Sequence, residues 1–234
     1  MANEPITLTK LMGKPDFVPE KRMEANAEKI ILAHLQKRRQ ADDLFPITAD
    51  DLTTLIEDYV SDLNVYDELS EFGAGVEGVT LFVPGSKPTV RICPSLSEAS
   101  NQNRYRSTLA HEFGHVVLHD PMFQAKNGQG LFPPGQPAFQ VSFRDGEASE
   151  SKSDLYEWQA WYFCRSLLMP SSEVRRLIAT LRGDWLSDIW VQSDLGYAVI
   201  RAASARFGVS EALARIQLVK SGALSETEPA PSLF

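Results

Sequence analysis

Three of the chain's four histidines lie in the segment "HEFGHVVLH", which runs from residue 111 to residue 119. His111 and His115 are four residues apart and Glu112 follows the first of them, which is an H-E-x-x-H pattern. Residues four apart share one face of a helix, so both imidazoles can reach one metal ion. Glu112 can then accept a proton from a water molecule that the ion activates. The pattern indicates metal-assisted hydrolysis, and zinc is the expected ion.

His119 is not expected to be a ligand of the same ion. It lies eight residues after His111, which is about 12 Å along a helix. No glycine in "VVLH" would turn the chain back toward the metal. We interpret His119 either as packing at the end of the helix or as a group behind the ligands, with Asp120 as a candidate partner. The alternative for the whole segment is a buried helix with satisfied core histidines, but two histidines at this spacing favour the metal.

The third ligand must come from another part of the chain, because a catalytic zinc ion takes three protein ligands and keeps one position for water. Residues 153–169 predict an apolar helix that carries two acids near its start. Asp154 falls in the first turn, where an acid suits the helix dipole. Glu157 lies beside tryptophans on a surface expected to face the core, where a carboxylate needs a partner. These arguments favour Glu157 over Asp154 only modestly.

The elements that must position these residues predict an α+β fold. Apolar spacing indicates helices at 18–39, after a capping box at 48–51, at 101–119 and at 153–169, and two more within 196–223. Two β-rich stretches between 62 and 94, "VEGVTLFV" and "TVRIC", predict a short antiparallel sheet. Residues 120–152 are rich in proline and glycine and predict a long irregular excursion that forms one wall of a cleft, with "AFQVSF" as an edge strand.

The composition excludes several classes of protein. The 234-residue chain is 43% hydrophobic and carries a net charge of −8, so its overall charge does not favour nucleic acid or anionic membranes. The N-terminal "MANEPITLTK" lacks the features of a signal peptide, and no segment has the roughly 20 apolar residues of a membrane span. Two cysteines argue against a disulfide framework and favour a cytoplasmic location.

Three blocks of the sequence together resemble the ImmA/IrrE family of bacterial zinc metallopeptidases. They are "RSTLAHEFGHVVLH", "EWQAWYFCRSLLMP" and "ARFGVSEALARIQLVKSGAL", in the order found in that family and within residues 75–223. The resemblance implies a zincin-like fold in which a small antiparallel sheet packs on the active-site helix. It implies that His111, His115 and Glu157 bind Zn²⁺ and that Glu112 is the catalytic base. We therefore expect an N-terminal extension at 1–16, the metallopeptidase domain at 17–183, a helix-turn-helix-like segment at 184–223 and a disordered tail at 224–234.

The resemblance also implies a biological role. Family members act on small helix-turn-helix repressors, and their action switches on stress, mobile-element or anti-phage defence genes. DNA damage, sensed as single-stranded DNA, is the implied trigger. The alternative is a zinc-containing regulator that binds a repressor or DNA without hydrolysis. A local excess of positive charge within 197–220 could contact DNA, although packing beside the peptidase is the favoured interpretation of this segment. No membrane partner is expected.

Two further roles are hypotheses from the sequence. Cys93 ends the strand "TVRIC" shortly before the metal helix, so its thiolate could occupy the open position on zinc and block water. A small buried apolar residue is the equally weighted alternative. A second donor to the oxyanion is also expected, and Tyr66, Tyr105 and Arg106 are the candidates.

Overall fold

The computed structural model describes residues 6–39, 44–97, 101–143, 155–182 and 189–228. The helices are α1 (Leu8–Met12), α2 (Glu20–Arg38), α3 (Ala49–Glu57), α4 (Gln102–Gly128), α5 (Leu155–Leu168), α6 (Ser171–Arg182), α7 (Asp194–Phe207) and α8 (Glu211–Lys220), with short 3-10 turns η1 (Ser70–Phe72) and η2 (Pro94–Ser97). The strands are β1 (Ile6–Thr7), β2 (Asp62–Asn64), β3 (Val76–Phe82), β4 (Thr89–Ile92) and β5 (Ala138–Phe143). The predicted α+β class is confirmed. None of the described helices has the length and apolar character needed to span a membrane.

Within the described residues the strands form one sheet in the order β1-β5-β3-β4-β2. The central strand β3 pairs antiparallel with β4 and β5, as the sequence predicts for the first of these pairs. The outer pairs, β1 with β5 and β2 with β4, are parallel, so the sheet is mixed rather than wholly antiparallel. Strand β1 belongs to the expected N-terminal extension, and it therefore joins this part of the extension to the sheet.

The segment 120–152 differs from its prediction. Helix α4 continues to Gly128 with Pro121 inside it, and residues 138–143 form β5 between β1 and β3 instead of an edge strand. The prediction of an irregular excursion is therefore wrong for residues 120–128. The strand predicted at 138–143 is confirmed, but it is not an edge strand. Residues 144–152 lie outside the described part of the chain.

Burial explains why α4 passes through a proline that removes one backbone hydrogen bond. Phe123, in the turn after Pro121, is fully buried against the rings of Phe82 and Phe132, with ring centroids 5.8 and 5.6 Å away. The amide of Gln124 donates to the backbone carbonyls of Val83 and Ser86. These contacts fix the last turns of α4 to β3 and to the loop that follows it.

The two faces of the sheet have different neighbours, because successive side chains of a strand point to opposite faces. Val90 and Ile92 of β4 belong to the main core, together with Leu109 and Phe113 of α4. On the other face, Val79 of β3 and residues of β5 pack in a separate cluster beneath the segment around η1. The helical layer that contains α4 and α5 thus covers only one face of the sheet.

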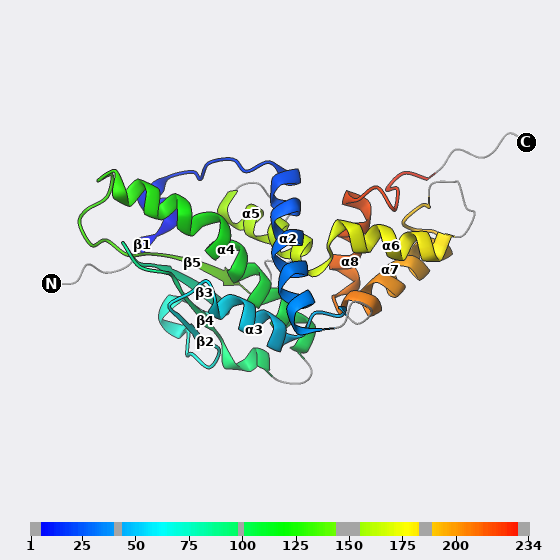
Figure 1. The fold of residues 1–234 in the computed structure, drawn as a ribbon, viewed down its shortest axis with the longest axis horizontal. Helices are drawn as coiled ribbons and strands as arrows, with labels where there is room; N and C mark the ends of the chain where they lie inside the picture. Colours follow the sequence, from blue (N-terminus) through cyan, green and yellow to red (C-terminus); the bar gives the residue numbers. More distant parts are fainter. Residues whose placement is uncertain (1–5, 40–43, 98–100, 144–154, 183–188, 229–234) are drawn as a thin grey trace, which may run out of the picture.

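The C-terminal helices α6, α7 and α8 lie together at the end of the molecule opposite the sheet (Figure 1). Arg106 of α4 donates to the carbonyl oxygen of Gly208, the left-handed residue between α7 and α8, and Arg206 donates to the carbonyl oxygen of Phe45. Leu224, in the segment expected as a disordered tail, is buried. These contacts attach the helix-turn-helix-like segment to the rest of the chain.

Helices α4 and α5 approach each other closely at Gly114. A Cβ atom at this position would lie 2.9 Å from the carbonyl oxygen of Ala160 and 3.1 Å from its Cα atom. Real Cβ atoms essentially never come so close to a rigid backbone, so the contact requires glycine. Gly114 directly precedes His115, and Ala160 lies one turn after Glu157. This close contact between the helices is therefore adjacent to the predicted ligands.

We expect Gly114→Ala to lower the free energy of unfolding by about 1–3 kcal/mol, because the added methyl group overpacks a backbone contact. Gly128→Ala is the matched control, since Gly128 is also in α4 and a Cβ atom added there would meet no other atom within 4 Å. The control should leave stability unchanged or raise it by up to about 1 kcal/mol, because alanine favours a helix. Urea denaturation measures both changes. Equal stability of the two variants would show that the close approach is not required.

Candidate metal and active site

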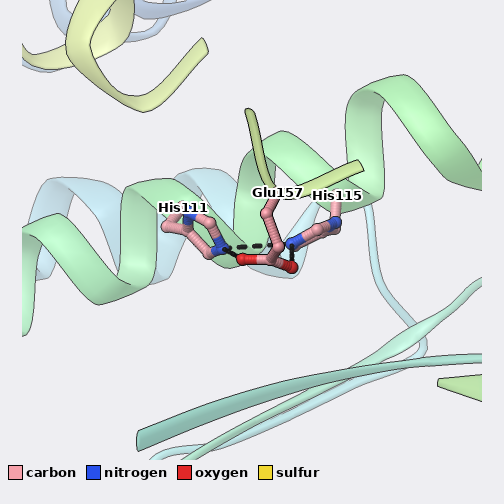
Figure 2. A group of neighbouring side chains, drawn as sticks. All are labelled: His111, His115 and Glu157. Carbon is pink, nitrogen blue, oxygen red and sulfur yellow. Dashed lines mark hydrogen bonds and ion pairs between the residues drawn. The ribbon is translucent and has the colours of Figure 1, made fainter. Parts of the chain in front are cut away.

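Helix α4 brings the two motif histidines together on its buried face. His111 and His115 are both fully buried, and their Nε2 atoms are 3.0 Å apart. The ring of Trp161 from α5 packs on His111, with ring centroids 4.3 Å apart. The i, i+4 spacing therefore has the consequence expected from the sequence: both imidazoles point their Nε2 atoms at the same place (Figure 2).

Helix α5 supplies the third group. The Glu157 carboxylate lies 3.1 Å from His111 Nε2 through Oε2 and 3.2 Å from His115 Nε2 through Oε1. Burial raises the pKa of Glu157, but the two neighbouring histidines outweigh burial and hold that pKa well below its usual range. The side chain keeps 26% of its surface exposed, so solvent can reach the site beside Glu157. Asp154, the other acid considered from the sequence, lies outside the described residues.

The spacing of the three ligand atoms fits a zinc ion. Zinc holds nitrogen and oxygen ligands at about 2.0–2.2 Å, so neighbouring atoms in a tetrahedral site are separated by about 3.3 Å. Here the two Nε2 atoms are 3.0 Å apart, and each lies 3.1–3.2 Å from one oxygen of the Glu157 carboxylate, His111 from Oε2 and His115 from Oε1. Two Nε2 lone pairs that face each other at this distance repel unless a cation or a proton lies between them. His111, His115 and Glu157 are also the one group of potential ligands found within the described residues.

Glu112 is fully buried under the sheet. Its Oε2 atom accepts a hydrogen bond of 2.6 Å from the Thr80 hydroxyl of β3, and its Oε1 atom accepts one of 2.6 Å from the Ser142 hydroxyl of β5. Gly78 permits this arrangement, because a Cβ at residue 78 would clash with the Glu112 carboxylate and lie 2.8 Å from Ser142 Oγ. The carboxylate is therefore fixed on two sides, next to a metal ligand in the chain.

Sequence reasoning missed the polar residues that the sheet contributes. Besides Thr80 and Ser142, these include Gln140 of β5, whose Nε2 atom donates to Glu157 Oε1 over 2.7 Å. A signal was present in "AFQVSF", where glutamine and serine alternate with apolar residues and so share one face of a strand. Which face points toward the ligands depends on the order of strands in the sheet, and the sequence alone does not give that order.

His119 is a group behind the ligands, and the helix does not end near it. Its Nδ1 atom lies 2.9 Å from His115 Nδ1, and its Nε2 atom lies 3.0 Å from Gln159 Oε1. Burial, followed by the nearby His115, lowers the pKa of His119 well below its usual value, so the imidazole is neutral near pH 7. Asp120 is not its partner in these contacts, since that carboxylate accepts a hydrogen bond from Gln124.

Cys93 is not among the three residues that the described structure groups as potential metal ligands. Strand alternation explains this: Val90 and Ile92 face the core that contains α4, whereas Cys93 packs with the cluster on the opposite face of the sheet. Its thiol lies 3.2 Å from the Ser95 hydroxyl. The strand β4 that precedes Cys93 is an interior strand, between β3 and β2.

The three candidate oxyanion donors lie in different surroundings. Arg106 donates to Asn103 Oδ1 and to the carbonyl oxygen of Gly208, so its guanidinium serves the contact with the C-terminal helices. Tyr105 is buried and Tyr66 is exposed. Burial, and then the neighbouring Tyr66, raises the pKa of Tyr105. Both tyrosines stay predictions as oxyanion donors.

We expect the wild-type chain to bind one zinc ion and Glu157→Gln to bind it more weakly. Loss of a residue that only hydrogen-bonds a metal ligand costs about ten- to hundredfold in affinity, and loss of the ligand itself should cost more. The amide keeps the size of the side chain but lacks its charge. Glu71→Gln is the control, because Glu71 is an exposed acid paired with Arg91. Competition with a chromogenic chelator measures the affinity. Equal affinities of wild type and Glu157→Gln would remove Glu157 from the ligand set.

Comparison with known proteins agrees with this geometry. A search of curated proteins found no match. A family model described as the IrrE N-terminal-like domain, Peptidase_M78, matches residues 88–218, which is more than half of the chain. The matched region runs from β4 into α8 and includes both motif histidines, Glu112 and Glu157. The chain therefore belongs to the Peptidase_M78 family of metallopeptidases.

Proposed function

We propose that this protein is a zinc-dependent endopeptidase that cleaves a helix-turn-helix repressor. The observation that carries the catalytic part of the proposal is the cluster of His111, His115 and Glu157, with the adjacent Glu112 of the motif held by Thr80 and Ser142. A structural zinc site is usually closed by four protein ligands, whereas three ligands leave a position for water. This donor set is typical of a hydrolytic site.

A bound zinc ion would supply Lewis-acid chemistry, which lowers the pKa of a water molecule and polarises the peptide carbonyl. The remaining steps belong to Glu112. Its carboxylate takes the proton from water as that water attacks the carbonyl, and it then gives the proton to the leaving amine. Each carboxylate oxygen has two lone pairs. The hydroxyls of Thr80 and Ser142 each use one of them, so one lone pair on each oxygen can still accept a proton.

The repressor is proposed on the resemblance to the ImmA/IrrE family, whose members act on small helix-turn-helix repressors. Cleavage would switch on stress, mobile-element or defence genes, and DNA damage, sensed as single-stranded DNA, is the proposed trigger. The partly exposed Glu157 supports a site that an extended polypeptide can approach from one side.

Contact between DNA and the C-terminal segment has less support. The local positive charge rests on Arg201, Arg206, Arg215 and Lys220. Of these, Arg206 is engaged with the Phe45 carbonyl and ring, and Arg215 lies 3.4 Å from the carboxylate of Glu226. These contacts favour a packing role for α7 and α8.

The test combines purified protein, zinc and the helix-turn-helix repressor encoded nearest to its gene. We expect the wild type to cleave the repressor at one or a few sites. Glu112→Gln should abolish cleavage, with a loss of at least about a hundredfold, because the amide cannot take the proton. The same variant should still bind zinc, since Glu112 is not a ligand. Mass spectrometry identifies the products and chelator competition checks the metal.

Two outcomes would contradict the proposal. Equal cleavage by wild type and Glu112→Gln would exclude Glu112 as the base. Zinc binding and repressor capture by the wild type, with no cleavage in the presence of single-stranded DNA, would favour the alternative of a regulator that does not hydrolyse its partner.

A further inference from the structure

A chain of buried hydrogen bonds runs from the metal site to the N-terminal part of the protein. It begins at His115, passes through His119 on the next turn of α4, and continues to Gln159 on α5. Gln159 Nε2 then donates to the carbonyl oxygen of Asp16 over 2.9 Å. His115, His119 and Gln159 are all fully buried. A buried chain of polar groups costs free energy unless each donor faces an acceptor. This requirement determines which atom of each pair donates the proton.

The direction can be read from the Asp16 end. A backbone carbonyl only accepts, so the Gln159 amide must turn its NH₂ group toward Asp16 and its oxygen toward His119. An amide oxygen also only accepts, which requires a proton on His119 Nε2. With one proton on its ring, His119 presents Nδ1 as an acceptor to His115. A neutral His115 then carries its proton on Nδ1, which leaves on Nε2 a lone pair for a metal ion in place of a hydrogen bond to Glu157.

We propose that His119 is a positioning residue for the metal site: it fixes His115 in the tautomer whose Nε2 atom can bind zinc, and Gln159 with the Asp16 carbonyl fixes His119 in turn. If each donor and acceptor in the chain of hydrogen bonds were exchanged, His115 would carry its proton on Nε2, at the metal site, and this proton would oppose metal binding. Outer partners of metal-bound histidines commonly act in this way. The inference rests on the zinc site of the proposed function.

The other histidine of the site lacks this support among the described residues. His111 Nδ1 is buried and has no hydrogen-bond partner there. Its ring is held instead by packing on Trp161. Within the described residues, the hydrogen bond from His119 therefore acts on the tautomer of His115, whereas His111 is held by packing.

The N-terminal end of the chain of hydrogen bonds is also anchored. The ring of Phe17, directly after Asp16, stacks on Trp158 of α5 at 6.3 Å with an interplanar angle of 14°. Trp158 lies between Glu157 and Gln159, so the segment at 16–17 contacts α5 next to both the ligand and the relay residue. The segment before α2 is thus tied to the metal site by a hydrogen bond and by a ring contact.

The test measures zinc affinity of the full chain by chelator competition. His119→Leu removes the acceptor at similar volume and should weaken zinc binding by about ten- to hundredfold. His119→Asn places an amide oxygen near the position of Nδ1, so it should recover a substantial part of the loss. Gln159→Leu breaks the chain one step further away and should cost less than His119→Leu. His34→Leu, which changes a histidine on α2, should leave the affinity unchanged.

A second readout does not depend on activity. At a pH where His115 is neutral, long-range ¹H–¹⁵N spectra of the zinc-free wild type should show the His115 proton on Nδ1, and in His119→Leu they should show a mixture of tautomers. A purely structural role for His119 would leave this tautomer unchanged, even if the variant were less stable. The spectrum of the wild type therefore tests the inference even if the leucine variant does not fold.

The outcomes separate this inference from the proposed function. Wild type that binds zinc, together with a folded His119→Leu variant of equal affinity, would overturn the positioning role and leave the zinc site intact. Equal losses in His119→Leu and His119→Asn would assign His119 to packing and also overturn the role. A neutral His115 that carries its proton on Nε2 in the zinc-free wild type would do the same. Failure of the wild type to bind zinc at all would overturn the proposed function and this inference together.

Discussion

The contact between Gly114 of α4 and the backbone of Ala160 in α5 determines the geometry of the whole site. A side chain at residue 114 would hold the helices apart, because the neighbouring atoms belong to rigid backbone. The ligands lie within one turn of this contact on both helices. The separations of 3.0–3.2 Å between ligand atoms therefore depend on a helix packing distance that only glycine allows. This is why the glycine in "HEFGH" matters beside the histidines.

A second constraint is the enclosure of charged and polar groups between helices and sheet. Three site residues of α4, His111, Glu112 and His115, are fully buried, and a buried polar group without a partner is costly. Alternate positions of β3 and β5 carry polar side chains that point toward α4 and supply these partners. Thr80 and Ser142 fix the catalytic carboxylate. The sheet thus acts as a polar wall for the active site as well as the partner of a hydrophobic core.

The sequence predicts some parts of this arrangement better than others. The H-E-x-x-H spacing is a local pattern, and it predicts correctly that His111 and His115 meet on one helix face. Glu157 lies on another helix, so residue types alone favoured it only modestly and the family resemblance was needed. Cys93 shows the opposite case. Its position along the chain suggested proximity to the metal, but strand alternation turns it to the other face of the sheet. Strand order and facing are tertiary properties, which local patterns do not encode.

The family match begins at residue 88, yet the groups that hold the site in place extend well before it. Thr80 and Gly78 come from the strand that precedes the match, and the Asp16 carbonyl comes from the segment before α2. The ligands and the base all lie inside the matched region. The residues that orient them are therefore partly supplied by a part of the chain outside the matched region. Changes in that part can alter metal affinity and the position of Glu112 while every residue of the H-E-x-x-H motif stays the same.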